Sequence, residues 1–224
     1  MTLMGYGMKI ILSLGACVIL AFTGNAQTTI PGVFSTGVDD SGKLLAAGQT
    51  DPSWTISSSP LGAVSALAVT SLNKNWVANT ASSEWINANG IGQGPAPAGL
   101  YVYTLTFSLN GLSPATAQIA GEWSSDNASE IFLNGINTGF SNTSTGFKAL
   151  DPFSITNDFV AGENELQLYV TQDPDAPGGN GVGNPEGLQV NIFSATGDPV
   201  PEPATISLFA LSMLGICLNK KQAR

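Results

Sequence analysis

The sequence predicts an all-β domain, an antiparallel β-sandwich or jelly roll, between a hydrophobic helix at each end of the chain. Three observations lead to this fold class. Several short segments alternate apolar and polar residues with a period of two, which is typical of half-buried antiparallel strands. Turn-forming residues separate these segments, in a chain with 26 glycines and 13 prolines. No segment of the domain shows a convincing apolar stripe with the 3.6-residue period of a helix.

Residues 101–109 form the clearest predicted strand, because aromatic and aliphatic side chains occupy every second position. Asn134-Gly135 is the strongest two-residue hairpin signal in the chain. Further strands are predicted at 118–123, 130–133, 136–138, 153–155, 165–171 and 188–192, with weaker signals at 33–35, 54–56 and 66–70. A single helical turn is allowed only near 82–85 or 112–115.

The N-terminus has the pattern of an export signal. Lys9 precedes the apolar stretch 10–22, and Gly24-Asn25-Ala26 offers small residues for a signal peptidase. We therefore expect residues 1–26 to be a signal peptide that is cleaved after Ala26. A lipoprotein signal ending at Cys17 is the alternative.

The C-terminus has an apolar run of 15 residues, 204–218, followed by a basic tail. Its helical length of about 22 Å is short of a bilayer core of about 30 Å, but snorkelling lysines and local thinning make a transmembrane helix plausible. The positive tail predicts a cytoplasmic C-terminal end. The alternative is a helix buried in the core. Residues 27–193 are then the folded domain and 194–199 a linker.

The motif that precedes this run is Val200-Pro201-Glu202-Pro203. Together with the apolar run and the basic tail, it resembles the PEP-CTERM sorting signal of Gram-negative bacteria over residues 200–224. The resemblance implies processing by an exosortase, a membrane transpeptidase that removes the tail. It also implies a precursor anchored in the inner membrane and a product at the cell surface or in the extracellular matrix.

Composition excludes several function classes. Residues 27–199 hold 15 acidic and 3 basic residues, a net charge of −12, so nucleic acid is not an expected partner. The chain has no histidine, which excludes Ser-His-Asp and Cys-His catalysis and imidazole metal sites. Its two cysteines, Cys17 and Cys217, lie in the terminal apolar segments, so the domain cannot form a disulfide.

A second resemblance lies within the domain. Residues 121–135, 159–166 and 187–191 look like parts of galactose-binding-like jelly-roll modules, and the likeness extends over about residues 100–193. It implies the fold more than the ligand, since one fold serves many functions.

Two sets of residues are candidate glycan contacts. Asp126 and Asn127 lie in a turn between predicted strands and offer oxygens and an amide for sugar hydroxyls; alternatively they only bond the backbone of the turn. Trp76 and Trp85 flank a polar loop, and one of them is the best candidate for an exposed aromatic platform for a pyranose ring. The alternative is that both belong to the core.

Structural calcium is a candidate cofactor, because acidic turns supply the oxygen ligands that it prefers. The candidate ligands are Asp39, Asp40, Asp173 and Asp175, none of which has EF-hand spacing. Solvated turn acids are the alternative interpretation.

These observations predict an exported, non-enzymatic protein that acts in adhesion or matrix organisation through weak binding of extracellular polysaccharide. The alternative is a purely structural matrix protein that binds no glycan. A third is a small glycoside hydrolase in which Glu122 pairs with Asp126 or Glu130.

Overall fold

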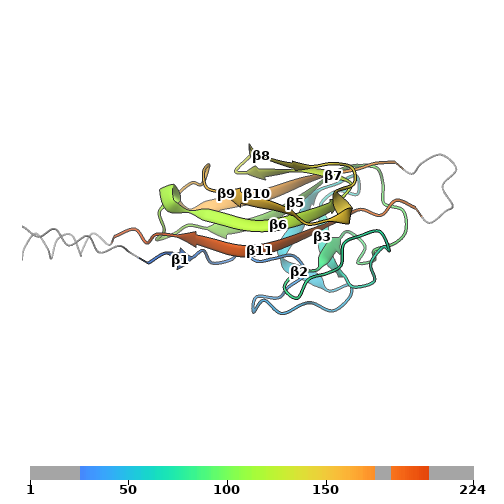
Figure 1. Cartoon of the computed structure of the whole chain (residues 1–224), viewed down its shortest axis with the longest axis horizontal. Coiled ribbons are helices and arrows are strands. Elements are labelled where there is room, and N and C mark those ends of the chain that lie inside the picture. Colours follow the sequence, from blue (N-terminus) through green and yellow to red (C-terminus); the bar gives the residue numbers. More distant parts are fainter. Residues whose placement is uncertain (1–25, 175–182, 202–224) are drawn as a thin grey trace, which may run out of the picture.

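The computed structural model describes residues 26–174 and 183–201, and Figure 1 shows its arrangement of strands. Most of residues 1–26, Asp175, Glu202, Pro203 and the apolar run 204–218 lie outside the described residues. The strands and two short 3₁₀ helices are, in chain order, β1 Thr28–Thr29, β2 Thr50–Ser58, β3 Val64–Val69, β4 Trp85–Asn87, β5 Gly99–Ser108, η1 Pro114–Thr116, β6 Gln118–Asp126, β7 Ala128–Leu133, β8 Ile136–Asn142, η2 Gly146–Lys148, β9 Asp151–Ile155, β10 Glu163–Gln172 and β11 Gly187–Gly197.

All the strand pairs are antiparallel, and the strands follow one another in the order β8-β7-β10-β5-β2-β3-β4-β11-β6-β9. The short β1 pairs with β11 outside this order. The sheet folds over so that β10 and β5 lie across the core from β6 and β11 (Figure 1). This is the predicted all-β jelly roll.

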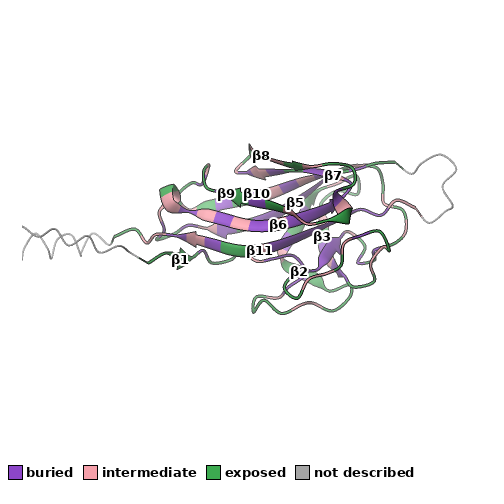
Figure 2. Ribbon diagram, in the orientation of Figure 1, coloured by how far each residue is buried: buried purple, intermediate pink, exposed green. Residues whose placement is uncertain are grey.

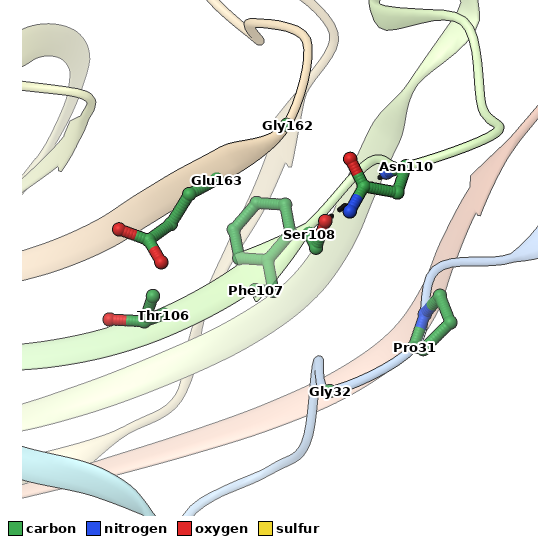
Figure 3. A pocket seen from close by; sticks show the side chains of 8 residues that line it. All are labelled: Pro31, Gly32, Thr106, Phe107, Ser108, Asn110, Gly162 and Glu163. Carbon is green, nitrogen blue, oxygen red and sulfur yellow. Dashed lines mark hydrogen bonds between the residues drawn. The ribbon is translucent and has the colours of Figure 1, made fainter.

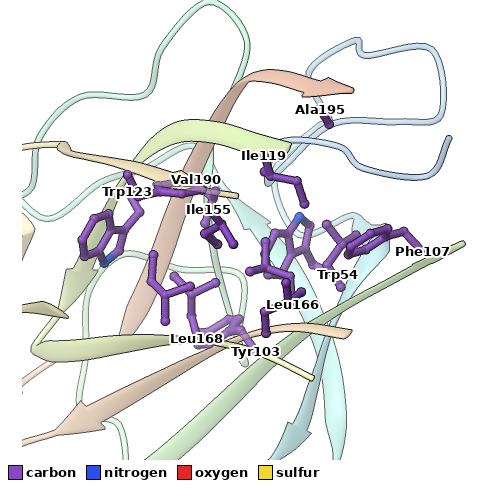
Figure 4. Close-up of a cluster of buried hydrophobic side chains, with 14 of the residues drawn as sticks. Trp54, Tyr103, Phe107, Ile119, Trp123, Ile155, Leu166, Leu168, Val190 and Ala195 are labelled. Atoms are coloured by element: carbon purple, nitrogen blue, oxygen red, sulfur yellow. The ribbon is translucent and has the colours of Figure 1, made fainter. Parts of the chain in front are cut away.

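The core forms because the inward positions of these strands are apolar. β5 and β10 pair over their whole length, with Leu105 opposite Leu166 and Tyr103 opposite Leu168. Figure 4 shows Tyr103, Leu166 and Leu168 meeting Trp123, Val190 and Ile155 from the facing strands. Figure 2 shows buried and partly buried residues alternating along the first part of β6.

The predicted hairpin is confirmed. β7 and β8 are joined at Asn134 and Gly135, whose φ angles are 52° and 77°. A two-residue type I′ turn needs positive φ at both central positions, and Asn-Gly accepts this most readily. Trp123 is buried, and its indole N–H donates to Ser129 Oγ at 2.9 Å.

Two local expectations are wrong, and a third is met at one of its two places. Residues 33–35 are not a strand. A helical turn forms as η1 near 112–115, as allowed, but not at 82–85, where the chain leads into β4. Residues 194–197 are not a free linker, because β11 continues to Gly197 and pairs there with β1 and β6. The pairing also brings the two ends of the described chain side by side (Figure 1). Within residues 26–174 and 183–201, no helix has the length and apolarity needed to cross a membrane.

Candidate functional site

The two tryptophans expected to offer a platform lie in the interior instead. Trp76 is 6% exposed and Trp85 is fully buried, so the prediction of an exposed ring at either position is wrong. β4 lies between β3 and β11 and carries Trp85 inward. The two indole rings stack with centroids 4.1 Å apart and an interplanar angle of 21°. They pack against Gly187, where a Cβ atom would lie 2.7 Å from the Trp76 ring.

Asp126 and Asn127 do lie beside Trp76, as members of a buried network. The Trp76 indole N–H donates to Asp126 Oδ2 at 2.7 Å, and the Asn127 side-chain amide donates to Asp126 Oδ1 at 2.7 Å. The pKa of Asp126 is raised to about 6, mainly by burial and also by the nearby charge of Asp173, while the bond from Trp76 opposes both. Both carboxylate oxygens are therefore occupied by partners within the protein.

The Asn127 side chain holds the two described ends of the long polar loop together. Its Oδ1 accepts the backbone N–H of Asp173 at 2.8 Å and the side-chain amide of Asn184 at 3.1 Å. Gln172 donates to the backbone carbonyl of Asn184 at 2.6 Å. These contacts fit the alternative interpretation, in which Asp126 and Asn127 bond the chain around them rather than a glycan.

A second buried carboxylate was missed by the sequence reasoning. Glu186 is 2% exposed, and burial raises its pKa to about 7. Its oxygens accept the Tyr103 hydroxyl and the Ala88 backbone N–H, the latter at 2.9 Å. No signal in the sequence marks it, because a glutamate between Pro185 and Gly187 is ordinarily solvated.

Three of the four candidate calcium ligands, Asp39, Asp40 and Asp173, are among the described residues, and these three are not gathered into one site. Asp39 Oδ1 accepts the Ser41 N–H at 2.8 Å, the Ser41 hydroxyl at 2.6 Å and the Lys43 N–H at 3.0 Å. The bond from the Ser41 hydroxyl contributes most to lowering the pKa of Asp39. Asp40 is exposed beside it, and Asp173 starts the long loop. Among the described residues, which leave out Asp175, no three acidic, histidine or cysteine side chains are grouped as candidate ligands of one metal ion.

The carboxylate pairs considered for hydrolysis lack catalytic geometry. Glu122 and Asp126 lie four residues apart on β6, roughly 13 Å along a strand, whereas glycosidase carboxylates lie about 5–9.5 Å apart. Glu122 accepts the Asn191 amide at 3.0 Å. Glu130 is on β7, which pairs with β8 and β10 rather than with β6.

An aromatic pair on the outer surface of the sheet is the other site that sequence reasoning missed. Phe132 on β7 and Tyr169 on β10 are half-buried and stack with centroids 4.3 Å apart and an interplanar angle of 26°. Each lies between two fully buried apolar neighbours in its strand and therefore points outward. An aromatic residue at the polar position of an alternating strand is the signal that could have found both.

Polar side chains surround this pair. Gln167 and Asn137 lie opposite Phe132 on the two neighbouring strands, and Glu130 lies opposite Tyr169. The Asn137 amide donates to Glu130 Oε1 at 3.2 Å. We call Phe132, Tyr169, Gln167, Asn137 and Glu130 the outer aromatic face. It combines flat rings with amide and carboxylate groups on one surface.

A hollow of about 520 Å³ lies where the N-terminal segment passes β5 and β10 (Figure 3). Pro31 and Gly32 form one side and Thr106, Phe107 and Ser108 another. Glu163 is the one charged side chain in its lining, and the N-terminal side offers no polar side chain to face it. Its other polar side chains, Thr106, Ser108 and Asn110, come from β5 and the residues that follow it, so the hollow has polar side chains on one side only.

Comparison with known proteins identifies the C-terminal segment. The family model of the PEP-CTERM protein-sorting motif matches residues 199–221. No curated protein matches the chain.

Solved structures similar to the chain are carbohydrate-binding modules. One is a CBM35 from Paenibacillus barcinonensis, with a TM-score of 0.33, 14% identity, and coverage of 64% of this chain and 94% of that one. Another is a CBM36 in complex with calcium and xylotriose, with a TM-score of 0.27, 18% identity, and coverage of 45% and 75%. These TM-scores are too low to carry ligand or mechanism across. The chain thus combines a jelly-roll domain with a PEP-CTERM sorting motif, which indicates an exported protein sorted to the cell envelope.

Proposed function

We propose that this protein is a non-catalytic component of the cell surface or extracellular matrix that binds polysaccharide weakly through its outer aromatic face. After export and processing by an exosortase, it would contribute to adhesion or matrix organisation. The sorting motif supports the destination. The binding role is supported by the outer aromatic face.

The observation that carries the proposal is the stacked pair of Phe132 and Tyr169 with polar partners around it. Pyranose rings present C–H-rich faces that pack on aromatic rings, and their hydroxyls bond to planar amide and carboxylate groups. Gln167 and Asn137 supply amides on either side of Phe132, and Glu130 supplies a carboxylate beside Tyr169. This arrangement suits one or two sugar residues of a longer chain.

Charge selects the kind of polysaccharide. The domain has a net charge of −12, and Glu130 and Glu165 are exposed on the same side of their strands as the aromatic pair. Uronate-rich or sulfated chains would be repelled, so we expect a neutral glycan. Because the face is open rather than a deep pocket, affinity would come from repeated contacts along the chain.

The test is binding of the protein, without its terminal hydrophobic segments, to a polysaccharide panel. Phe132→Ala and Tyr169→Ala should each lose most of the binding to a neutral glycan. Phe193→Ala is the matched control, because Phe193 is 63% exposed but lies on β11. A blank panel for the folded wild-type protein would reject the proposal.

A structural matrix role without glycan binding is the second candidate. It is favoured by the fact that cross-strand aromatic pairs also stabilise sheets by themselves. In that case Phe132→Ala would lower stability while the panel stayed blank for every variant.

A further inference from the structure

The domain holds the residues that lead directly into the sorting motif. The Asp198 carbonyl accepts the Ser113 N–H at 2.8 Å, and the Asp198 N–H donates to Thr116 Oγ1 at 2.9 Å. The Val200 N–H donates to the Gly111 carbonyl at 2.8 Å. Residues 198–200 therefore lie docked on the segment 111–116 and are not a free tether.

A β-bridge lies between these contacts. Pro199 is opposite Leu112 in an isolated antiparallel bridge, and Leu112 is 7% exposed and part of the core. Val200 contributes little burial of its own, since it is 51% exposed. An open hollow of about 280 Å³ lies beside Val200 and Pro201. Hydrogen bonds rather than apolar packing by Val200 hold residues 198–200 in place.

Docking of residues 198–200 leaves few residues between the domain and the apolar run 204–218. Only residues 201–203 separate Val200 from Ala204, where the apolar run starts. Three extended residues span at most about 10 Å, which is about the spacing of two packed sheets. With the apolar run in the bilayer, a folded enzyme would have no room to enclose the motif while Val200 stays docked.

We propose that release of residues 198–200 from the segment 111–116 must precede processing of the sorting motif, so that this docking limits the processing rate. Release leaves β11 intact to Gly197, where β1 still pairs with it. The free segment then becomes 198–203, which reaches about 20 Å. The domain thereby controls how readily a membrane-bound enzyme reaches its substrate segment.

The first test locks the docked state with a disulfide. Leu112→Cys together with Pro199→Cys places thiols at opposed positions of an antiparallel bridge, where the Cα separation suits a disulfide. Full-length protein is expressed in its own host with Cys217→Ala in all forms, and conversion of precursor is followed by pulse-chase. Non-reducing electrophoresis confirms the bond.

We expect the locked precursor to be processed at least about tenfold more slowly than wild type, because the three hydrogen bonds of residues 198–200 can no longer open together. Reductant should restore the rate, and each single cysteine variant should behave like wild type. Wild-type rates in the oxidised double variant would overturn the proposal.

The second test separates access from other effects of the lock. About six Gly and Ser residues inserted between Pro199 and Val200 keep the motif intact and lengthen its reach past the lock. This spacer should speed processing of the wild-type domain several-fold and rescue the oxidised double variant without reductant. If the spacer fails to rescue it, restricted reach is not the cause and the inference fails. Neither test depends on glycan binding.

Discussion

The buried Glu186 carboxyl should make the domain more stable in mild acid than at neutral pH. Its pKa is raised from 4.5 to about 7, mainly by burial, while the Tyr103 hydroxyl and the Ala88 N–H oppose this in part. A group whose pKa is raised by folding stabilises the folded state when protonated. That stabilisation is complete below about pH 4.5 and is lost as the pH rises through about 7.

The size of the effect follows from the two pKa values. Each pKa unit corresponds to about 1.4 kcal/mol, so the rise from 4.5 to about 7 amounts to about 3 kcal/mol. This is a large part of the net stability of a domain, which is typically about 5–15 kcal/mol. Asp126 has its pKa raised to about 6, so it should also lower the free energy of unfolding as the pH rises, over a lower pH range than Glu186.

Glu186→Gln removes the ionisation while keeping the shape of the side chain. The amide oxygen can still accept the Ala88 N–H. We expect the variant to match wild type near pH 4.5 and to exceed it by about 3 kcal/mol in free energy of unfolding at pH 8. Urea unfolding followed by tryptophan fluorescence from pH 4.5 to 8 measures this.

Glu165→Gln is the control, because Glu165 is an exposed glutamate on β10. Its variant should keep the wild-type pH dependence. If Glu186→Gln also kept it, the carboxyl would not be held protonated by its surroundings, and the reasoning would be refuted.

Three further predictions concern the interior of the same end of the domain and the Asp39 turn. Asp126→Ala leaves the buried N–H groups of Trp76 and Asn127 without an acceptor. Urea unfolding at pH 5 should therefore show a loss of about 2 kcal/mol or more in the free energy of unfolding. No loss would mean that water replaces the carboxylate. Gly187→Ala puts a methyl group 2.7 Å from the Trp76 ring. This should lower the free energy of unfolding by about 1–3 kcal/mol and weaken the near-ultraviolet circular dichroism of the stacked indoles. An unchanged spectrum would contradict the described packing. Asp39→Ala should lower the thermal midpoint equally in calcium and in EDTA, because its carboxylate bonds Ser41 and Lys43 rather than an ion; a loss seen only in calcium would restore the metal hypothesis.

The sequence predicts the long central strands well because their signals are local. β10 alternates over ten residues, the sequence of β5 has an apolar residue at every second position from Tyr101, and Asn134-Gly135 fixes the turn between β7 and β8 without help from distant parts of the chain. β4 could not be predicted in this way. Its three residues are all buried and show no alternation, and the strand exists because β3 and β11 lie on either side of it.

The candidate site was harder to predict for a related reason. Trp76 and Trp85 flank a polar loop in the sequence, which favours exposure, but their stack is completed by Gly187 about a hundred residues later. Phe132 and Tyr169 come together only because β7 pairs with β10 in one particular register. Local patterns indicate which way a side chain points, whereas partners across strands depend on the topology.

The pairing of Thr28–Thr29 with Thr196–Gly197 has a consequence for how the newly exported chain matures. In a precursor with the proposed leader and tail, both segments would join the domain at neighbouring points, so the domain could finish folding without rotating or threading either one. Whichever was removed first, the other would keep the same pole of the domain towards the lipid. The opposite pole, with Gly187 at the other end of an 11-residue strand, would then lie about 35 Å farther from the lipid.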